Sequence, residues 1–317
     1  MPIQLQDFDF ERVLDENPYF RCLNALGTLP ASSISSSDAS LSGSTSDGRL
    51  PAILRLERTP FPLTLPQEFS SGVLEQAKSL GNTDIYTWMN GWLKRRDDLP
   101  DLKISVICPA TEVHIRKYSK QDILMVHETP ELYEKVVKPY IEAFPPSRTQ
   151  WVRNILDGTS EAHSLLHSTD ELLILPDMKW DPTTSPLTAL YLLALVRDPS
   201  IRSMRDLRGG ENGHLPLLKA IRDAAHSVVD RKYGLARGSV RLYVHYQPSY
   251  YHFHVHIVHA SQSGIMGMTV GQAHLLDDII SLLTVAPDIL SSLTLTYGLG
   301  SQHGLYEPML AVQGNVA

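Results

Sequence analysis

The chain has 317 residues, of which 43% are hydrophobic and 20% are charged, and its formal net charge is -7. This length and composition predict a globular protein of about two domains. The acidic balance argues against a protein that holds long nucleic acid along a basic surface, so any nucleic-acid ligand is expected to be a short piece bound in a pocket.

Cysteine usage and the N-terminus indicate the compartment. The two cysteines, Cys22 and Cys108, are too few for a disulfide framework and favour a reducing environment. Segment 1–16 has acidic residues where a signal peptide needs basic and then apolar ones, and the longest apolar stretch, 190–196, is too short to cross a bilayer. We therefore expect a cytoplasmic or nucleocytoplasmic protein that does not enter membranes.

The N-terminal third predicts a small α+β domain over 1–120. Its serine-rich segment 31–49 (ASSISSSDASLSGSTSDGR) cannot bury enough apolar surface to offset the entropy of ordering, which predicts a disordered insertion. Apolar stretches at 52–57 and 103–108 have strand lengths and strand composition. Between them, 74–80 is interpreted as a short helix.

The remainder predicts a second α+β domain over 121–317 with an antiparallel sheet. Helices are expected around 117–127 and 131–144, with the domain boundary near 120–128. The later expected elements are a buried strand at 172–175, an apolar helix at 187–196, an amphipathic helix at 215–232, strands at 240–246 and 252–258, and a second amphipathic helix at 270–283.

Three histidines alternate with apolar residues at the most informative point of the chain. His252, His254 and His256 are separated by Phe253 and Val255. In a strand this spacing places the imidazoles on one face and the apolar side chains on the other.

Three interpretations of this triplet compete. The histidines could form an ordinary polar strand face. They could bind a metal ion, although three ligands on a straight strand span too far for one tetrahedral site, and His245 or His259 would have to assist. Alternatively, an imidazole whose other nitrogen is hydrogen-bonded can attack phosphorus while its neighbours neutralise phosphate charge.

The third interpretation is favoured by a resemblance. Residues 252–258 (HFHVHIV) match the signature of the histidine-triad superfamily, in which histidines alternate with apolar residues. The resemblance implies that His254, the middle histidine, is the nucleophile, that His252 and His256 orient it and bind phosphate oxygens, and that no metal or other cofactor is needed.

Further segments resemble one branch of that superfamily, the scavenger mRNA decapping enzymes, over about two thirds of the chain. The matching strings are PATEVHIRKY (109–118), QWVRNILDG (150–158) followed by Glu161, ILPDMKW (174–180), IRSMRDL (201–207) and VHYQPSYYHFHVH (244–256). Together they are far more specific than the triplet alone.

The resemblance assigns roles to individual residues. Trp151 would stack on the cationic 7-methylguanine, and Met178 would pack on its other face. Glu161 and Asp177 would accept hydrogen bonds from the donor edge of the base, and Pro176 would shape the pocket. The residues expected on the phosphate side are Lys179, Lys117, Tyr118, His245, Ser249, Tyr250 and Gln272.

Two departures from the family pattern weaken parts of this assignment. Gln272 precedes the string Ala273–Leu276 (AHLL), where the better-known animal members have an arginine that reaches the phosphates. Glutamine can donate a hydrogen bond but carries no charge. The N-terminal domain also matches loosely, because Asn82 is followed by Thr83 before the string Asp84–Tyr86, and the register is unsettled.

The resemblance implies hydrolysis of 7-methylguanosine-capped dinucleotides or short capped RNA by a homodimer that exchanges N-terminal elements. Long nucleic acid and membranes are not expected partners. The alternatives are a cap-binding regulator of the same family with little turnover, and a different histidine-triad hydrolase acting on dinucleoside polyphosphates or nucleotidyl amidates.

Overall fold

The computed structural model describes residues 4–33, 48–183, 185–263 and 266–313, and the chain forms two compact units, Met1–Gln121 and Asp122–Ala317. The predicted disorder of 31–49 concerns mainly residues 34–47, which lie outside the described part. Within the described ranges, no helix is both long and apolar enough to cross a membrane.

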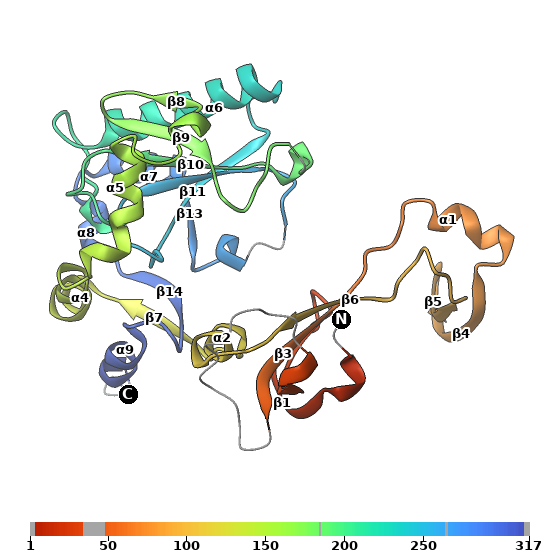
Figure 1. The fold of residues 1–317 in the computed structure, drawn as a ribbon. Coiled ribbons are helices and arrows are strands. Elements are labelled where there is room, and N and C mark those ends of the chain that lie inside the picture. Colours follow the sequence, from red (N-terminus) through yellow and green to blue (C-terminus); the bar gives the residue numbers. More distant parts are fainter. Residues whose placement is uncertain (1–3, 34–47, 184, 264–265, 314–317) are drawn as a thin grey trace. The chain divides into compact units, whose positions relative to one another are not determined.

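The N-terminal unit is built on a four-stranded antiparallel sheet in the order β1-β2-β3-β6 (Figure 1). Its strands are β1 (Asp9–Asn17), β2 (Cys22–Pro30), β3 (Arg49–Arg58) and β6 (Leu102–Ile107). The predicted strands at 52–57 and 103–108 are confirmed as β3 and β6, which pair with each other. A small apolar core of Leu14, Leu26, Ile53 and Ala110 lies next to helix α2 (Glu112–Tyr118).

A separate hairpin in this unit corrects one prediction. Strand β4 (Leu74–Thr83) pairs antiparallel with β5 (Tyr86–Leu93), so the helix expected at 74–80 is wrong. The aromatic residues of β5, among them Trp88 and Trp92, have high strand propensity, and cross-strand pairing overrides the weak local helix preference of β4. The short helix α1 (Leu65–Glu68) precedes the hairpin.

The C-terminal unit contains a six-stranded antiparallel sheet in the order β13-β11-β12-β10-β9-β8 and a two-stranded sheet of β14 and β7 (Figure 1). The strands are β7 (Ile123–Glu128), β8 (His167–Ser168), β9 (Leu172–Pro176), β10 (Tyr191–Val196), β11 (Val240–His245), β12 (His254–His259), β13 (Ala273–Leu275) and β14 (Leu295–Gly300). The α+β class with an antiparallel C-terminal sheet is thereby confirmed.

The helices of this unit are short except for α6. They are α3 (Pro130–Leu132), a π-helical turn (Tyr133–Val137), α4 (Lys138–Glu142), α5 (Gln150–Leu156), α6 (Leu215–Tyr233), α7 (Leu276–Val285), α8 (Ile289–Ser292) and α9 (Tyr306–Gln313). Among the described residues of both units, short 3-10 turns lie at Leu5–Asp7, Ala31–Ser33, Phe69–Ser71, Pro146–Thr149, Ala162–Ser164, Leu187–Ala189, Met204–Asp206 and Met266–Met268.

The predicted elements of this unit are partly confirmed. Those at 131–144, 172–175, 215–232 and 240–246 match helices α3 to α4, strand β9, helix α6 and strand β11.

Three other predictions are wrong in type or extent. The apolar run 187–196 is not a helix: β10 is buried at every position, and a central strand covered on both faces gives a continuous apolar pattern that periodicity cannot distinguish from a buried helix. The helix expected at 117–127 ends with α2 at Tyr118, and strand β7 follows. The helix expected at 270–283 begins only at Leu276, after β13.

Helices cover the two faces of the six-stranded sheet differently. Apolar side chains of α6 and α7, such as Ile221 and Ile279, belong to the main core together with Val255 and Ile257 of β12. Helix α5 lies on the other face (Figure 1). Its Val152 and Ile155 pack with leucines of β9 and β10. Because α5 has only seven residues, it covers only part of this face of the sheet. The candidate site lies on the same face.

Candidate functional site

Strand β12 positions two of the three histidines. It is central in the sheet, between β11 and β10, and its register places His254 opposite Leu195 and His256 opposite Leu193. Because side chains alternate along a strand, both imidazoles share the face that carries α5. Both are almost completely buried, with 4% and 5% of their surfaces exposed.

His254 is held in a form suited to nucleophilic attack. Its Nδ1 lies 2.7 Å from the carbonyl oxygen of His252. A carbonyl can only accept, so Nδ1 carries the hydrogen and Nε2 keeps a free lone pair. Burial, only partly opposed by this hydrogen bond, lowers the pKa of His254 to about 3, and the ring is therefore neutral at physiological pH.

His252 has a different place from the one predicted. The strand expected from 252 begins at His254, and His252 lies in the preceding loop. Its Nε2 donates to the carbonyl of Val196 at 2.6 Å, at the end of β10. Burial lowers the pKa of His252. The residue lines a cavity of about 670 Å3 together with Arg153 and Arg202. His252 thus supports His254 through its backbone carbonyl.

His256 belongs to a buried group of rings with Tyr191, Tyr243 and His245. Its Nδ1 is 2.9 Å from the hydroxyl of Tyr191, and its ring centroid is 4.3 Å from that of His245. Its Nε2 is buried and has no hydrogen-bond partner among the described residues. Burial first, and then the neighbouring His254, His245 and Lys179, hold the pKa of His256 well below its usual value.

A row of aromatic rings in contact with one another connects the histidines to α5. The ring of Tyr250 lies almost parallel to His254, with centroids 4.3 Å apart and an interplanar angle of 12°. Trp151 meets Tyr250 edge to face at 5.0 Å. Trp151 keeps 42% of its surface exposed, although it lies on the same helix as the buried Val152 and Ile155. An aromatic surface is therefore available beside His254.

The turn after β9 brings together several candidates for base recognition. Oδ1 of Asp177 accepts from the backbone N–H of Lys179 at 2.9 Å, which fixes the turn. Met178 is 98% exposed, and Pro176 is the last residue of β9. Nζ of Lys179 lies 5.3 Å from the ring centroid of Tyr191, and its charge contributes to lowering the pKa of His254.

Within the described residues, the other sequence candidates make no contact with the histidines that the structure records. Glu161 is exposed and has a left-handed φ of 53° in the segment after α5. Ser249 is exposed in the loop between β11 and β12. Nε2 of Gln272 donates to the carbonyl of Gly298 on β14 at 3.4 Å, so its amide is engaged there. Lys117 and Tyr118 belong to the N-terminal unit, at the end of α2.

Sequence reasoning missed Tyr191 and Tyr243. Both contact His256: Tyr191 through its hydroxyl, and Tyr243 through a ring stacked at 5.1 Å. The sequence predicts Tyr191 in the site only if 191–196 is assigned as a strand, because side chains alternate along a strand and Tyr191 then shares a face with Leu193 and Leu195. No group of three or more His, Cys, Asp or Glu that could hold a metal ion is found in the described ranges.

Comparisons with known proteins identify the family. The family model "Scavenger mRNA decapping enzyme (DcpS) N-terminal" matches residues 3–121, and "Scavenger mRNA decapping enzyme C-term binding" matches residues 150–271. The m7GpppX diphosphatase of Schizosaccharomyces pombe is 39% identical over 264 residues, covering 81% of this chain and 85% of the relative.

Animal proteins of the same name are similar to a comparable degree. The m7GpppX diphosphatase of Ascaris suum is 36% identical, covering 80% of this chain and 83% of its own, and that of Homo sapiens is 35% identical, covering 83% and 76%. The chain therefore belongs to the family of scavenger mRNA decapping enzymes.

Proposed function

We propose that this member of the scavenger decapping family hydrolyses 7-methylguanosine-capped dinucleotides and short capped oligonucleotides. The products are 7-methylguanosine monophosphate and a nucleoside diphosphate, or an RNA with a 5'-diphosphate. The observation that carries the proposal is the neutral His254, whose free Nε2 lies in a group of buried imidazoles next to an exposed tryptophan. The relatives named m7GpppX diphosphatase support the substrate class.

The proposed chemistry is covalent. Nε2 of His254 attacks the phosphorus next to 7-methylguanosine, an N–P bond forms, and the bond to the bridging oxygen breaks, which releases the diphosphate. Positive charge that develops on the imidazole is shared with the His252 carbonyl through Nδ1–H. Water then cleaves the N–P bond, releasing 7-methylguanosine monophosphate and restoring the neutral ring.

His256 is proposed to stabilise the phosphate. When the hydroxyl of Tyr191 donates to Nδ1, Nε2 of His256 carries the hydrogen and becomes a donor. Burial raises the pKa of Tyr191, which keeps the phenol protonated for this role. The otherwise unpaired Nε2 would then find its partner in a phosphate oxygen, with His245 and Lys179 as neighbours.

The base is proposed to bind between Trp151 and Met178. Stacking on an indole suits a 7-methylguanine because the base carries a delocalised positive charge. Asp177 and Glu161 are the proposed acceptors for its donor edge. The exposure of Trp151 and Met178 supports this assignment, since side chains of this size are otherwise buried when they serve the core.

A direct test incubates the purified protein with a 7-methylguanosine-capped dinucleotide in EDTA, beside His254→Ala. We expect release of 7-methylguanosine monophosphate by the wild type alone. Tight binding of the dinucleotide without release would instead support the regulator of the same family, for which the uncharged Gln272 leaves room. Equal affinity for guanosine monophosphate and its 7-methylated form would favour a different histidine-triad hydrolase.

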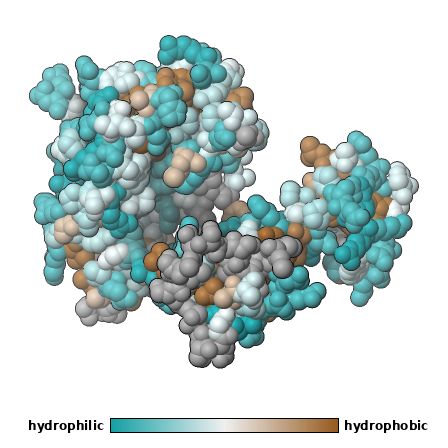
Figure 2. All heavy atoms as spheres, viewed as in Figure 1, coloured by the Kyte–Doolittle hydropathy of each residue, from teal (hydrophilic) through white to brown (hydrophobic). Residues whose placement is uncertain are grey.

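We also propose that the protein is a cytoplasmic homodimer that pairs through the β4–β5 hairpin. Every side chain of β5 up to Trp92 is exposed, including Trp88 at 50%. Figure 2 shows hydrophobic side chains among hydrophilic ones over this segment. A largely apolar groove of about 610 Å3 between the hairpin and the segment around α1 adds to this surface. Light scattering of the wild type against Trp92→Glu tests the dimer.

A further inference from the structure

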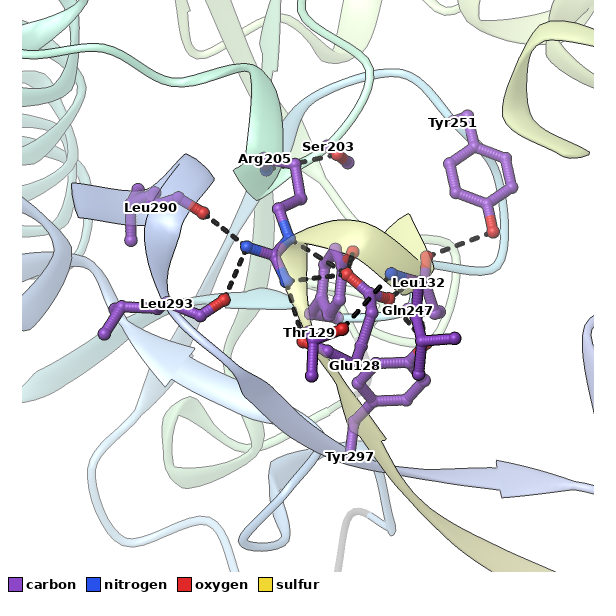
Figure 3. Close-up of polar contacts among 11 residues, drawn as sticks. Glu128, Thr129, Leu132, Ser203, Arg205, Gln247, Tyr251, Leu290, Leu293 and Tyr297 are labelled. Carbon is purple, nitrogen blue, oxygen red and sulfur yellow. Dashed lines mark hydrogen bonds and ion pairs between the residues drawn. The ribbon is translucent and has the colours of Figure 1, made fainter. Parts of the chain in front are cut away.

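A second buried polar cluster lies around Glu128, the last residue of β7 (Figure 3). Its carboxylate is 0% exposed and pairs with Arg205, whose Nε and Nη2 lie 2.9 and 2.8 Å from Oε1. The remaining guanidinium hydrogens are donated to the backbone carbonyls of Glu128, Leu290 and Leu293. We call this cluster the carboxylate hub; its members are Glu128, Arg205, Tyr246, Gln247, Tyr251 and Tyr297.

Three further donors complete the shell of Glu128. The hydroxyl of Tyr246 donates to Oε1 at 2.6 Å, the hydroxyl of Tyr297 donates to Oε2 at 2.6 Å, and Nε2 of Gln247 donates to Oε2 at 3.1 Å. Tyr297 comes from β14, whereas Tyr246 and Gln247 begin the loop that leads from β11 to β12. The hub therefore holds the start of this loop.

The same loop is closed on itself by one side-chain bond. The hydroxyl of Tyr251 donates to Oε1 of Gln247 at 3.1 Å, across the apex 248–250 (Figure 3). The Gln247 amide thus uses its nitrogen toward the hub and its oxygen toward Tyr251. The apex carries Tyr250, and the residue after Tyr251 is His252.

This loop supplies two of the contacts that orient the His254 ring, beside the edge-to-face contact with His256. One is the stacked ring of Tyr250, and the other is the His252 carbonyl that fixes the tautomer. We propose that Gln247 and Tyr251 are positioning residues for the nucleophile, clamping the loop to the carboxylate hub so that Nε2 of His254 is aimed at phosphorus. The proposal rests on the proposed function of His254.

The clamp acts on the chemical step. A small shift of the loop would change the direction of Nε2 and the share of the Nδ1–H tautomer. Trp151 contacts Tyr250, but it lies on α5, and Met178 lies in the turn after β9, so both should move less than the loop. Misplacement of a reacting group costs rate steeply. Loss of the clamp should therefore lower kcat with little change in KM.

Two tyrosine-to-phenylalanine variants give a matched test. Tyr251→Phe removes the hydroxyl that closes the loop. Tyr297→Phe removes a hydroxyl that binds the same hub from β14 and accepts from Nε2 of Gln247 at 3.3 Å, while Gln247 keeps its bonds to Glu128 and Tyr251. We expect kcat for a capped dinucleotide to fall about tenfold in Tyr251→Phe and less than about twofold in Tyr297→Phe, with KM within about twofold in both. Gln247→Met, which loses the amide contacts to Glu128, Tyr297 and Tyr251, should behave like Tyr251→Phe.

A spectroscopic measurement keeps the proposal separate from the proposed function. The 15N chemical shifts of His254 should indicate the Nδ1–H tautomer in the wild type and in Tyr297→Phe, and a mixture of tautomers in Tyr251→Phe. Equal loss of kcat in the two phenylalanine variants, or an unchanged tautomer in Tyr251→Phe, would overturn the positioning role. A wild type that does not cleave the dinucleotide would overturn the proposed function, and the nitrogen shifts would still decide whether the loop positions the ring.

Discussion

The C-terminal unit contains two buried polar clusters that satisfy their hydrogen bonds in opposite ways. In the carboxylate hub, Glu128 and Arg205 neutralise each other, and backbone carbonyls, tyrosines and Gln247 occupy the surrounding positions. Among the histidines of β12 and its neighbours, the buried Nε2 of His256 lacks a partner within the described residues, and burial lowers the pKa of both His254 and His256.

The difference indicates which cluster faces a ligand. A buried polar group without a partner costs free energy, so native structures seldom keep one unless water, an ion or a substrate completes it. The hub needs nothing further and belongs to the scaffold. In the proposed function, phosphate oxygens of the substrate complete the histidine cluster. Changes at Glu128 and Arg205 should therefore affect stability, whereas changes in the histidines, in their aromatic neighbours and in the loop held by Gln247 and Tyr251 should affect turnover and binding.

A large loss of stability is expected from Arg205→Met. This variant leaves the Glu128 carboxylate buried without its cation, and breaking a buried ion pair on one side costs about 3–5 kcal/mol. Urea unfolding at neutral pH measures the change. The double variant Glu128→Leu/Arg205→Met is the control, because it removes both charges together, and it should be more stable than Arg205→Met. A double variant less stable than Arg205→Met would show that the hub is not one coupled unit.

The pH dependence of the unfolding free energy distinguishes the histidine cluster from the carboxylate hub. His254 has a pKa of about 3 in the folded chain against 6.5 for an ordinary histidine, so between these pH values the unfolded chain binds one more proton at this position. Stability from this group is full above about pH 6.5 and falls as the pH drops toward 3, by about 1.4 kcal/mol per pH unit. His254→Gln should reduce the pH dependence of the unfolding free energy between pH 6 and 4 by about one proton. An unchanged slope would contradict the depressed pKa.

The histidine cluster was more accessible to sequence reasoning than the hub. His252, His254 and His256 alternate within a short segment, which by itself predicts a shared strand face. Strand β12 places His254 and His256 on one face. Glu128 and Arg205 are 77 residues apart, and each looks like an ordinary charged surface residue. Local pattern cannot reveal a pair that only the tertiary fold creates.

The errors in the fold have a related cause. Periodicity separates helices from strands only when one face is exposed to water. Strand β10 is buried on both faces, and its continuous apolar pattern predicts a helix instead. With a helix at this position, the alternation that places Tyr191 beside His256 is not apparent. The hairpin strand β4 has the opposite character, since it is largely exposed, and its pairing with β5 decided its structure. Both errors concern segments whose environment, rather than whose sequence, settles the conformation.

Trp151 and Trp180 provide the last test of the comparison, because one tryptophan lies beside the histidines and the other lies in the core. Trp151 is 42% exposed, whereas Trp180 is 4% exposed and packs edge to face on Tyr233. Trp151→Ala should change the unfolding free energy by less than about 1 kcal/mol and raise the KM for a capped dinucleotide about tenfold, since stacking a base on an aromatic ring contributes about 1–3 kcal/mol.

Trp180→Ala should do the reverse, with a loss of about 3–5 kcal/mol in stability, because it leaves a large cavity in the core. The preference for 7-methylguanosine monophosphate over guanosine monophosphate, measured by calorimetry, is the sharper criterion. A cationic base gains more from an indole face than a neutral base does, so the preference should shrink in Trp151→Ala and persist in Trp180→Ala at temperatures where that variant is folded. If Trp151→Ala keeps the full preference, the exposed indole is not the cap platform, and another surface beside Tyr250 must read the methylated base.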